Sequence, residues 1–441
     1  MVNGSDRSAA PEDGAAGSST EQKNPSSRSL SGLDGLNFLM ADVRDGLGPY
    51  LAIFLKGGQQ WGSGEIGIVM AASSLAAAVS QIPAGLMVDS LKIKRALVAA
   101  SGLLIAAACL LIAFFPRLPV VVAAQVMLGT ASAVIPPALA ALSLGIVGRR
   151  LLPARISRNE GFNHAGNFFA ASLAGGLGQY IGYDWIFYLV CFFAVASAAM
   201  VTLINPREID HELARGGEQK TEDGKCEPVL FRDLLKRRDL LVFLASVVLF
   251  HFGNAAMLPL AGQVLAQSHP GADAISLSAC IIAAQLVMIG VAWAVGRAMK
   301  AGYGRKTIFL VALAVLPIRG VLFSFVDFPV GVVAIQLLDG VAAGIFGVIS
   351  IIIAADLMRG TGRFNLAQGL VALCVGIGAG LSNLVAGFIV QGFGYPAGFV
   401  ALAGIALCAL VFFLLLMPET RPRDDGEDTA PARGTLAGAS A

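Results

Sequence analysis

The sequence predicts an all-α membrane protein with twelve transmembrane helices in two pseudo-symmetric halves of six. Three observations carry this prediction. Of the 441 residues, 56% are hydrophobic and only 14% are charged, whereas soluble domains carry about 25% charged residues. A transmembrane helix needs about 20 mostly apolar residues, and such stretches follow one another from residue 33 to residue 417. The second set of stretches also repeats features of the first.

The apolar stretches place the helices in order along the chain. In the first half we expect spans at 36–55, 65–88, 96–115, 120–147, 159–181 and 185–204. In the second half we expect them at 240–267, 276–299, 307–325, 330–355, 365–391 and 396–417. The halves are therefore 33–204 and 240–417, joined by a long polar linker at 205–239.

The two ends of the chain differ from this pattern. Residues 1–32 are rich in Ser, Gly and Ala and contain no apolar run, so they lack the core of a signal peptide and are expected to be a disordered tail. Residues 418–441 have the same character. Alternate loops, including 89–95, 148–158 and the linker, hold most of the Lys and Arg. By the positive-inside rule, both termini and the linker are cytoplasmic, and we expect a bacterial inner (plasma) membrane.

The repeat appears as a series of nearly equal offsets. Gln125 and Gly129 match Gln336 and Gly340 at an offset of 211. A shift of 210 aligns Pro49 with Pro259, and a shift of 212 aligns Gly166, Gln179 and Tyr183 with Gly378, Gln391 and Tyr395. Any single match is weak, but the series indicates a duplicated six-helix unit, as is common in transporters.

The loop after the second span carries the most specific motif. It reads Gly85-x-x-x-Asp89-x-x-x-x-Lys94-Arg95, and a weaker copy with Gly296, Arg305 and Lys306 follows the eighth span. Together with twelve spans and the repeat, this loop resembles the signature of the Major Facilitator Superfamily over roughly residues 33–417. Two departures stand out: Lys300 replaces the acid of the first copy, and Gln125 stands where many proton-coupled members carry Arg.

The loop residues predict a cytoplasmic gate. Gly85 lets two helices approach closely, and Asp89 can pair with basic side chains such as Arg95 or with a helix N-terminus. The alternative is ordinary loop charge without a gating role. The gate residues we expect are Gly85, Asp89, Lys94, Arg95, Gly296, Arg305 and Lys306.

The first span carries three ionisable residues near its middle, Asp42, Arg44 and Asp45. Such residues are costly in a bilayer and mark functional sites. Asp42 and Asp45 share a helix face, while Arg44 points away from Asp42. We expect Asp45, then Asp42, to carry protons, and Arg44 to contact substrate. The alternatives are a static ion-pair network and, for Asp42, a position wetted by the cytoplasmic surface.

The resemblance implies that spans 1, 4, 7 and 10 line a central cavity where substrate binds near the midplane. Asp339 is the third proton-coupling candidate, with pairing to Arg319 of the ninth span as the alternative. Histidine titrates close to neutral pH, so His251 is either a switch or a satisfied hydrogen-bonding group. The remaining substrate-binding candidates are Gln125, His251, Asn254, Gln336 and Asn383, with Asn163 and Asn167 at the entry to the fifth span.

No phosphate-binding loop, metal-ligand cluster or nucleophile constellation is present in the sequence. We therefore expect no cofactor, no metal and no enzymatic activity, and the net charge of +2 gives no reason to expect a nucleic-acid partner.

The first hypothesis is a monomeric secondary transporter, coupled to protons, that exports a small, moderately polar or amphipathic solute; uptake of a metabolite is the alternative. The second is a transporter-like receptor or scaffold that binds ligand without moving it.

Overall fold

The computed structural model describes residues 25–45, 47–215, 236–359 and 364–421, and the regular elements of these residues are helices. The first half contains α1 (Ser27–Asp45), α2 (Leu47–Ile53), η1 (Phe54–Gly58), α3 (Ser63–Ser90), α4 (Lys94–Phe114), α5 (Leu118–Ser132), α6 (Ile135–Tyr180) and α7 (Asp184–Leu203). Two short turns, η2 (Pro206–Glu208) and η3 (Leu213–Arg215), begin the linker. The second half contains α9 (Arg238–Asn254), α10 (Met257–Ser268), α11 (Asp273–Lys300), α12 (Arg305–Phe323), α13 (Pro329–Leu357), α14 (Phe364–Phe393) and α15 (Tyr395–Leu416).

In the described residues these elements form twelve helical rods, where a rod is one passage of the chain along the bundle. Some rods consist of two of the helices named above, and α6 contributes to two rods. Helices α1 and α2, which lie on either side of residue 46, make up one rod, α9 and α10 make up another with a turn at residues 255–256 between them, and α5 continues into the first part of α6. Within α6, Gly148 has φ 74° and ψ 169°, so the fourth rod ends there and the fifth begins; a positive φ of this kind favours glycine. Ten rods contain a stretch long and apolar enough to cross a bilayer. The α1–α2 rod and the part of α6 after Gly148, which carry several polar side chains, are the other two.

The two halves are related by pseudo-symmetry, which is visible in matching close contacts. A Cβ on Gly129 of α5 would lie 2.2 Å from the carbonyl oxygen of Ser73 on α3. A Cβ on Gly340 of α13 would lie 2.7 Å from the carbonyl oxygen of Ala284 on α11. The 211-residue offset of the sequence repeat relates Gly129 to Gly340 and Ser73 to Ala284. Glycine is needed in both places because two helix backbones meet there.

A second pair of contacts repeats in the same way. A Cβ on Gly166 of α6 would lie 2.0 Å from the carbonyl oxygen of Phe38 on α1, and one on Gly378 of α14 would lie 2.4 Å from that of Val248 on α9. The duplication therefore extends from sequence to backbone packing.

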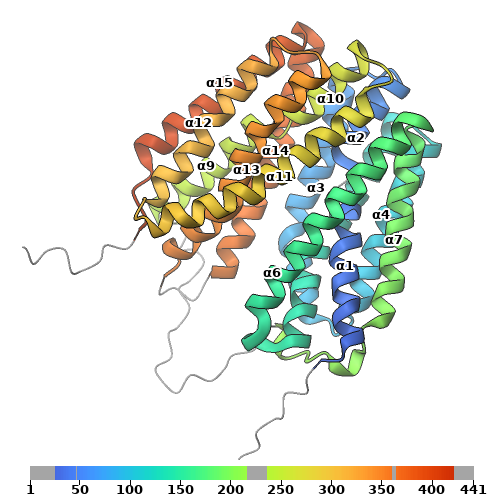
Figure 1. The fold of residues 1–441 in the computed structure, drawn as a ribbon, viewed down its shortest axis with the longest axis vertical. Coiled ribbons are helices and arrows are strands. Elements are labelled where there is room, and N and C mark those ends of the chain that lie inside the picture. Colours follow the sequence, from blue (N-terminus) through green and yellow to red (C-terminus); the bar gives the residue numbers. More distant parts are fainter. Residues whose placement is uncertain (1–24, 46, 216–235, 360–363, 422–441) are drawn as a thin grey trace, which may run out of the picture.

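The halves meet along two pairs of helices, α3 with α14 and α6 with α11 (Figure 1). At the first crossing Gly67 faces Gly387, where an added Cβ on Gly67 would lie 3.1 Å from the Gly387 Cα. At the second crossing Gly175 faces Ser278, whose Oγ would lie 2.3 Å from a Cβ on Gly175. The contacts involve the N-terminal parts of α3 and α11 and the C-terminal parts of α14 and α6. These parts lie at one end of the bundle, which we call the closed end.

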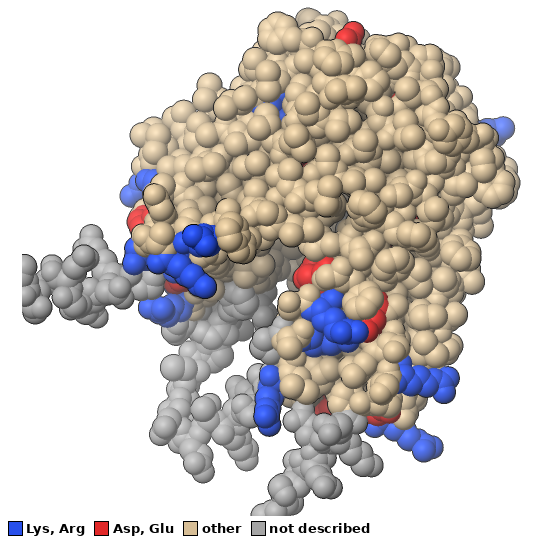
Figure 2. All heavy atoms as spheres, in the orientation of Figure 1, with Lys and Arg blue, Asp and Glu red and all other residues tan. Residues whose placement is uncertain are grey.

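The opposite end carries the start of α1, the short turns η2 and η3 and the start of α9, and we call it the linker end (Figure 1). Figure 2 shows the lobes merged into one apolar surface toward the closed end and divided by a notch toward the linker end. Most of the Lys and Arg visible in that view lie around the linker end. The structure therefore has its two halves joined at one end and parted at the other.

Two helix boundaries differ from the sequence prediction. Helix α1 begins at Ser27, inside the segment predicted to be a disordered tail, because the N–H and Oγ of Ser26 donate to Glu208 of the linker at 3.1 and 3.0 Å. The segment 148–158, predicted to be a loop, is helical after Gly148. The rest of the predicted N-terminal tail before residue 25, the tail after residue 421 and the linker between 216 and 235 lie outside the described residues.

Candidate functional site

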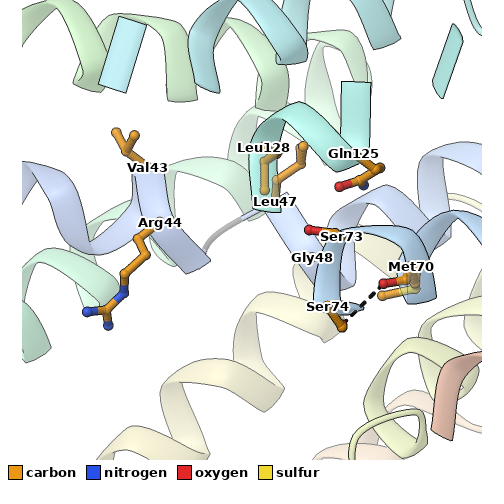
Figure 3. Close-up of a pocket in the computed structure, with 9 residues that line it drawn as sticks. All are labelled: Val43, Arg44, Leu47, Gly48, Met70, Ser73, Ser74, Gln125 and Leu128. Atoms are coloured by element: carbon orange, nitrogen blue, oxygen red, sulfur yellow. Dashed lines mark hydrogen bonds between the residues drawn. The ribbon is translucent and has the colours of Figure 1, made fainter. Parts of the chain in front are cut away.

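A small cavity of about 210 Å³ lies within the first half, between the first, second and fourth rods. It is lined by Val43, Arg44, Leu47, Gly48, Met70, Ser73, Ser74, Gln125 and Leu128. Figure 3 shows Ser73 and Gln125 close together on one side of it, while Arg44 extends from α1 on the other. Two predicted substrate-binding residues, Arg44 and Gln125, therefore line the same cavity.

The acids of the first span are placed differently from Arg44. The side chain of Asp42 is buried, with the residue 5% exposed, so it is not wetted by solvent as one alternative supposed. It does not line the cavity, and it interacts electrostatically with Tyr50 and with Cys109 of α4. Asp45 is the last residue of α1, and its side chain lies outside the described part of the structure. Asp42 thus faces the interior of the first half.

The second half contains a buried polar network centred on Arg319 of α12. One guanidinium nitrogen, Nη1, donates to Asp339 Oδ1 at 2.7 Å and also to the side-chain oxygen of Asn254. The other, Nη2, donates to Gln336 Oε1 at 2.7 Å. The network closes on itself, because the amide groups of Gln336 and Asn254 donate to Asp339 at 2.9 and 3.3 Å. Three predicted site residues, Asn254, Gln336 and Asp339, are joined by a residue that we considered only as a partner of Asp339.

The two charges of this network differ in exposure. The Arg319 side chain is 1% exposed, whereas that of Asp339 is 18% exposed. The guanidinium lies over the ring of Phe323, 5.3 Å from its centroid, and its Nε–H is buried without an acceptor among the described residues. The ion pair with Arg319, raised as the alternative for Asp339, is therefore present, and the carboxylate is its more accessible member.

His251 lies near this network and Asn383 lies at the crossing of α3 and α14, and each has its own partner. His251 Nδ1 donates to the carbonyl of Val247 at 3.0 Å, and its ring packs at 4.7 Å against Phe346. Asn383 is buried and its amide donates to the carbonyl of Ala379 at 2.9 Å. Neither side chain is joined to the Arg319 network by a hydrogen bond in the described residues.

The polar entry to the fifth span lies at the boundary between the halves. His164 Nδ1 lies 2.8 Å from the side-chain oxygen of Gln285 on α11, which is a direct contact across the molecule. Asn163 and Asn167, predicted to bind substrate, are half-buried on the same helix. His164, which follows Asn163 in the sequence, therefore makes a contact between the halves, and the sequence prediction gave it no role.

The signature loop lies at the linker end, where the halves are parted. Asp89 is exposed and has no ion pair with a described residue, while Arg95 donates to the carbonyl of Val201 at 3.0 and 3.2 Å. Lys94 is buried and donates to the carbonyls of Val88 and Leu91. The predicted Asp89–Arg95 pair is therefore absent from this structure.

The two loop glycines also differ from expectation. No heavy atom of the described residues lies within 4 Å of a Cβ built on Gly85 or Gly296, so neither is a point of close helix contact here. The physical reason is their place on the C-terminal parts of α3 and α11, where the halves do not touch. In the second copy of the motif, Arg305 pairs with Asp356 at 3.1 Å and Lys306 donates to the carbonyl of Leu414 at 2.8 Å.

The closed end is held by residues that the sequence marked only as repeat positions. Gln391 accepts a hydrogen bond from the Gly64 N–H at 3.0 Å, and the repeat-related Gln179 donates to the Gly271 carbonyl. Tyr183 donates to Asp273, and burial together with this carboxylate raises the pKa of Tyr183, which keeps its hydroxyl protonated.

Two further hydroxyl contacts cross between the halves. Tyr395 lies 3.4 Å from Ser63, and Tyr50 Oη lies 2.5 Å from Ser278 Oγ. Repeat alignment was the only signal in the sequence that could have found Gln179, Tyr183, Gln391 and Tyr395.

A charged cluster that sequence reasoning missed lies near the linker end of the first half. Asp34 pairs with Arg155 at 2.7 Å and with Arg158 at 2.8 Å, and Arg155 also donates to Asn159 at 2.6 Å. Asp34 precedes the apolar stretch that begins at Leu36. Burial raises the pKa of Asp34, but the hydrogen bond from Arg158 and the charge of Arg155 outweigh it and lower the pKa overall.

Two six-helix halves, joined at one end and parted at the other, with polar groups between apolar helices, define a helical membrane transporter. The chain belongs to the Major Facilitator Superfamily, whose profile matches residues 34–318 and 295–439. It is therefore a multi-pass integral membrane transporter and not an enzyme. In the described residues, no group of three or more His, Cys, Asp or Glu could hold a metal ion.

The relatives agree with this assignment. Two uncharacterized MFS-type transporters of Mycobacterium tuberculosis, from strains CDC 1551 and H37Rv, are each 44% identical over 402 residues, covering 91% of this chain and 96% of theirs. The nucleoside transporter NupG has a similar fold, with a TM-score of 0.70 at 14% identity over 88% of this chain and 98% of its own. A POT family transporter in complex with a thioalcohol-conjugated peptide gives 0.69 at 11% identity, over 88% and 96%.

Proposed function

We propose that this transporter moves a small organic solute by alternating access and couples the movement to protons. The observation that carries the proposal is the ion pair between Asp339 and Arg319, in which the carboxylate is the more accessible partner. A carboxylate that is partly exposed, and can therefore exchange protons, and that also holds a polar network together can link protonation to a change of contacts. Asp339 is therefore the coupling residue that the structure supports best.

Asp42 and Asp45 of α1 remain coupling candidates in the first half. Asp42 is buried within the helix bundle, where an acid is costly unless it has a role or partners. Asp45 ends α1 next to Arg44, which lines the cavity. We assign substrate contacts to Arg44 and Gln125 in the first half and to Asn254 and Gln336 in the second. In this assignment the solute bridges the two halves near the middle of the molecule.

The parted end supports the alternating-access part of the proposal. Among the described residues, Gly85 meets no close neighbour and Asp89 is exposed without an ion pair while the halves are parted at the linker end. We propose that they come into contact when that end closes and the closed-end hydrogen bonds break. By the distribution of Lys and Arg, the linker end and both termini face the cytoplasm, so the structure corresponds to an inward-facing state.

Transport with protons is tested after a solute has been found. Thermal-shift screening of the purified protein against a metabolite and drug library gives that solute. Its flux is then measured in proteoliposomes with an imposed pH gradient, with and without a protonophore. We expect the gradient to drive accumulation of the solute and the protonophore to abolish it, and the direction of that flux distinguishes export from uptake.

The matched variants are Asp339→Asn and Asp356→Asn, since both remove an acid of α13 that pairs with an Arg of α12. We expect Asp339→Asn to move solute across the membrane without responding to the gradient. Asp356→Asn removes the partner of the predicted gate residue Arg305, so its transport rate can change, but we expect its flux still to respond to the gradient. A solute flux that is unchanged by the protonophore and also unchanged by Asp339→Asn would contradict proton coupling. A solute that binds but never crosses the membrane favours the receptor alternative instead.

A further inference from the structure

The guanidinium of Arg319 is a buried charge that cannot be removed by deprotonation, because arginine stays protonated in proteins. Within the described residues, Asp339 is the one acid at ion-pair distance from it. Its other acceptors, Asn254 and Gln336, are neutral amides. The charge of Arg319 is therefore balanced by a single carboxylate.

The donor groups of Arg319 are also not all used. Nη1 donates to Asp339 and Asn254, and Nη2 donates to Gln336, but the Nε–H is buried without an acceptor in the described part of the chain. A guanidinium binds a carboxylate best through two parallel N–H groups. On the edge of Arg319 formed by Nε–H and Nη2, the Nε–H thus has no acceptor among the described residues. Nη2 donates to the neutral amide of Gln336, and a bound anion could replace that amide.

Protonation of Asp339 removes the one charge that balances Arg319. Removing one partner of a buried ion pair is strongly destabilising, because the other charge is left uncompensated. A transport cycle in which Asp339 takes up a proton therefore needs a second anion beside Arg319. The other titratable groups that interact with the pair are His251 of α9 and Cys280 of α11, and neither is an anion when it carries its proton.

We propose that the transported solute carries a carboxylate or a comparable organic anion, and that Arg319 binds this anion when Asp339 is protonated. This inference rests on the proposed proton coupling. One proton from water binds an Asp339 carboxylate oxygen, the Asp339–Arg319 ion pair breaks, and the solute anion forms the new ion pair. Proton and anion then cross together, with no net charge moved for a monoanion, and an inward proton gradient drives uptake.

The binding test uses small acids and their uncharged amides. Formate, acetate and benzoate are compared with formamide, acetamide and benzamide by thermal shift of the purified full-length protein at about pH 7.5 and about pH 5.5, on either side of the unperturbed histidine value. We expect the acids to stabilise the native protein more at the lower pH and the amides to have little effect. Asp339→Asn should bind the acids about tenfold more tightly than the native protein at the higher pH, with no dependence on pH.

Two variants separate the anion site from general effects. Arg319→Gln combined with Asp339→Asn removes both charges, which proteins tolerate far better than removal of one, and we expect it to fold and to bind none of the acids. Asp356→Asn, at the linker end, should respond as the native protein does. Equal stabilisation by acids and amides, retained acid binding in the double variant, or no acid binding by Asp339→Asn would overturn the inference. Proton-driven transport of a neutral solute would overturn it while leaving the proposed coupling intact.

Discussion

The backbone N–H of Gly64, at the start of α3, donates a hydrogen bond of 3.0 Å to the side-chain oxygen of Gln391, near the end of α14. It joins the two halves at the closed end. The repeat-related Gln179 makes the corresponding contact with Gly271 on the other side of the molecule. Because both contacts cross between halves, each must break when that end opens.

Replacing Gln391 by Ala should therefore favour opening of the closed end. One such hydrogen bond contributes about 1 kcal/mol, which corresponds to about a fivefold change in the population of the open form. The measurement is the rate of maleimide labelling of Ser278→Cys, which lies under the closed end, in a protein without other cysteines. Gln267→Ala, on the exposed surface of α10, is the control, and an equal rate in both variants would show that the contact does not hold this end closed.

The glycines of α6 give a prediction about stability. Gly166→Ala places a Cβ 2.0 Å from the Phe38 carbonyl oxygen, so α1 and α6 must move apart, whereas Gly176→Ala meets nothing within 4 Å. We expect Gly166→Ala to lose about 1–3 kcal/mol by overpacking and Gly176→Ala to be neutral or to gain about 0.5–1 kcal/mol, as helical Gly→Ala does. Thermal unfolding in detergent measures both, and equal stabilities would contradict the close approach.

The Arg319–Asp339 pair predicts strong non-additivity. Arg319→Met alone leaves Asp339 without its cation and should lose about 3–5 kcal/mol, while Arg319→Met with Asp339→Leu should be close to neutral. Chemical unfolding of the single and double variants measures this coupling. If the two single losses add up in the double variant, the side chains do not form a buried pair.

The two arginine partners of Asp34, near the linker end, predict how the stability of the protein depends on pH. Burial opposes ionisation of Asp34, but the hydrogen bond from Arg158 and the charge of Arg155 prevail, and its folded-state pKa lies below its unfolded value. A lowered acid pKa contributes stability that is complete above the unfolded value, about 3.9, and is lost as the pH falls through the folded value. Thermal unfolding from about pH 6 downward should show this loss.

The control for this prediction is Asp34→Asn, which cannot lose a charge. It should be less stable than the native protein at neutral pH and should converge with it in acid. Curves that stay parallel over the whole range would mean that Asp34 is not stabilised as an anion by the two arginines.

Much of the fold followed from local features of the sequence. Apolar stretches identify spans wherever they occur, and glycines such as Gly129 and Gly340 recur because backbone contacts in a duplicated unit need the same small residue. The candidate site was predicted only in part, since residue type marks Arg44, Gln125 and Asp339 as unusual in apolar helices but does not tell which side chains they meet.

What the sequence determined by itself is the family, the two six-helix halves and the positions of intramembrane polar residues, because these depend on composition and periodicity along one chain segment. Only the tertiary structure decided that Arg319 joins Asn254, Gln336 and Asp339, because the contact depends on the rotation and depth of three separate helices. It also decided that Asp42 is buried and that a Cβ on Gly85 would meet no near neighbour in the part of the chain that the structure describes. The burial of Asp42 depends on helix packing within the first half, and the open surroundings of Gly85 depend on how the halves are tilted against each other, and no local pattern encodes either.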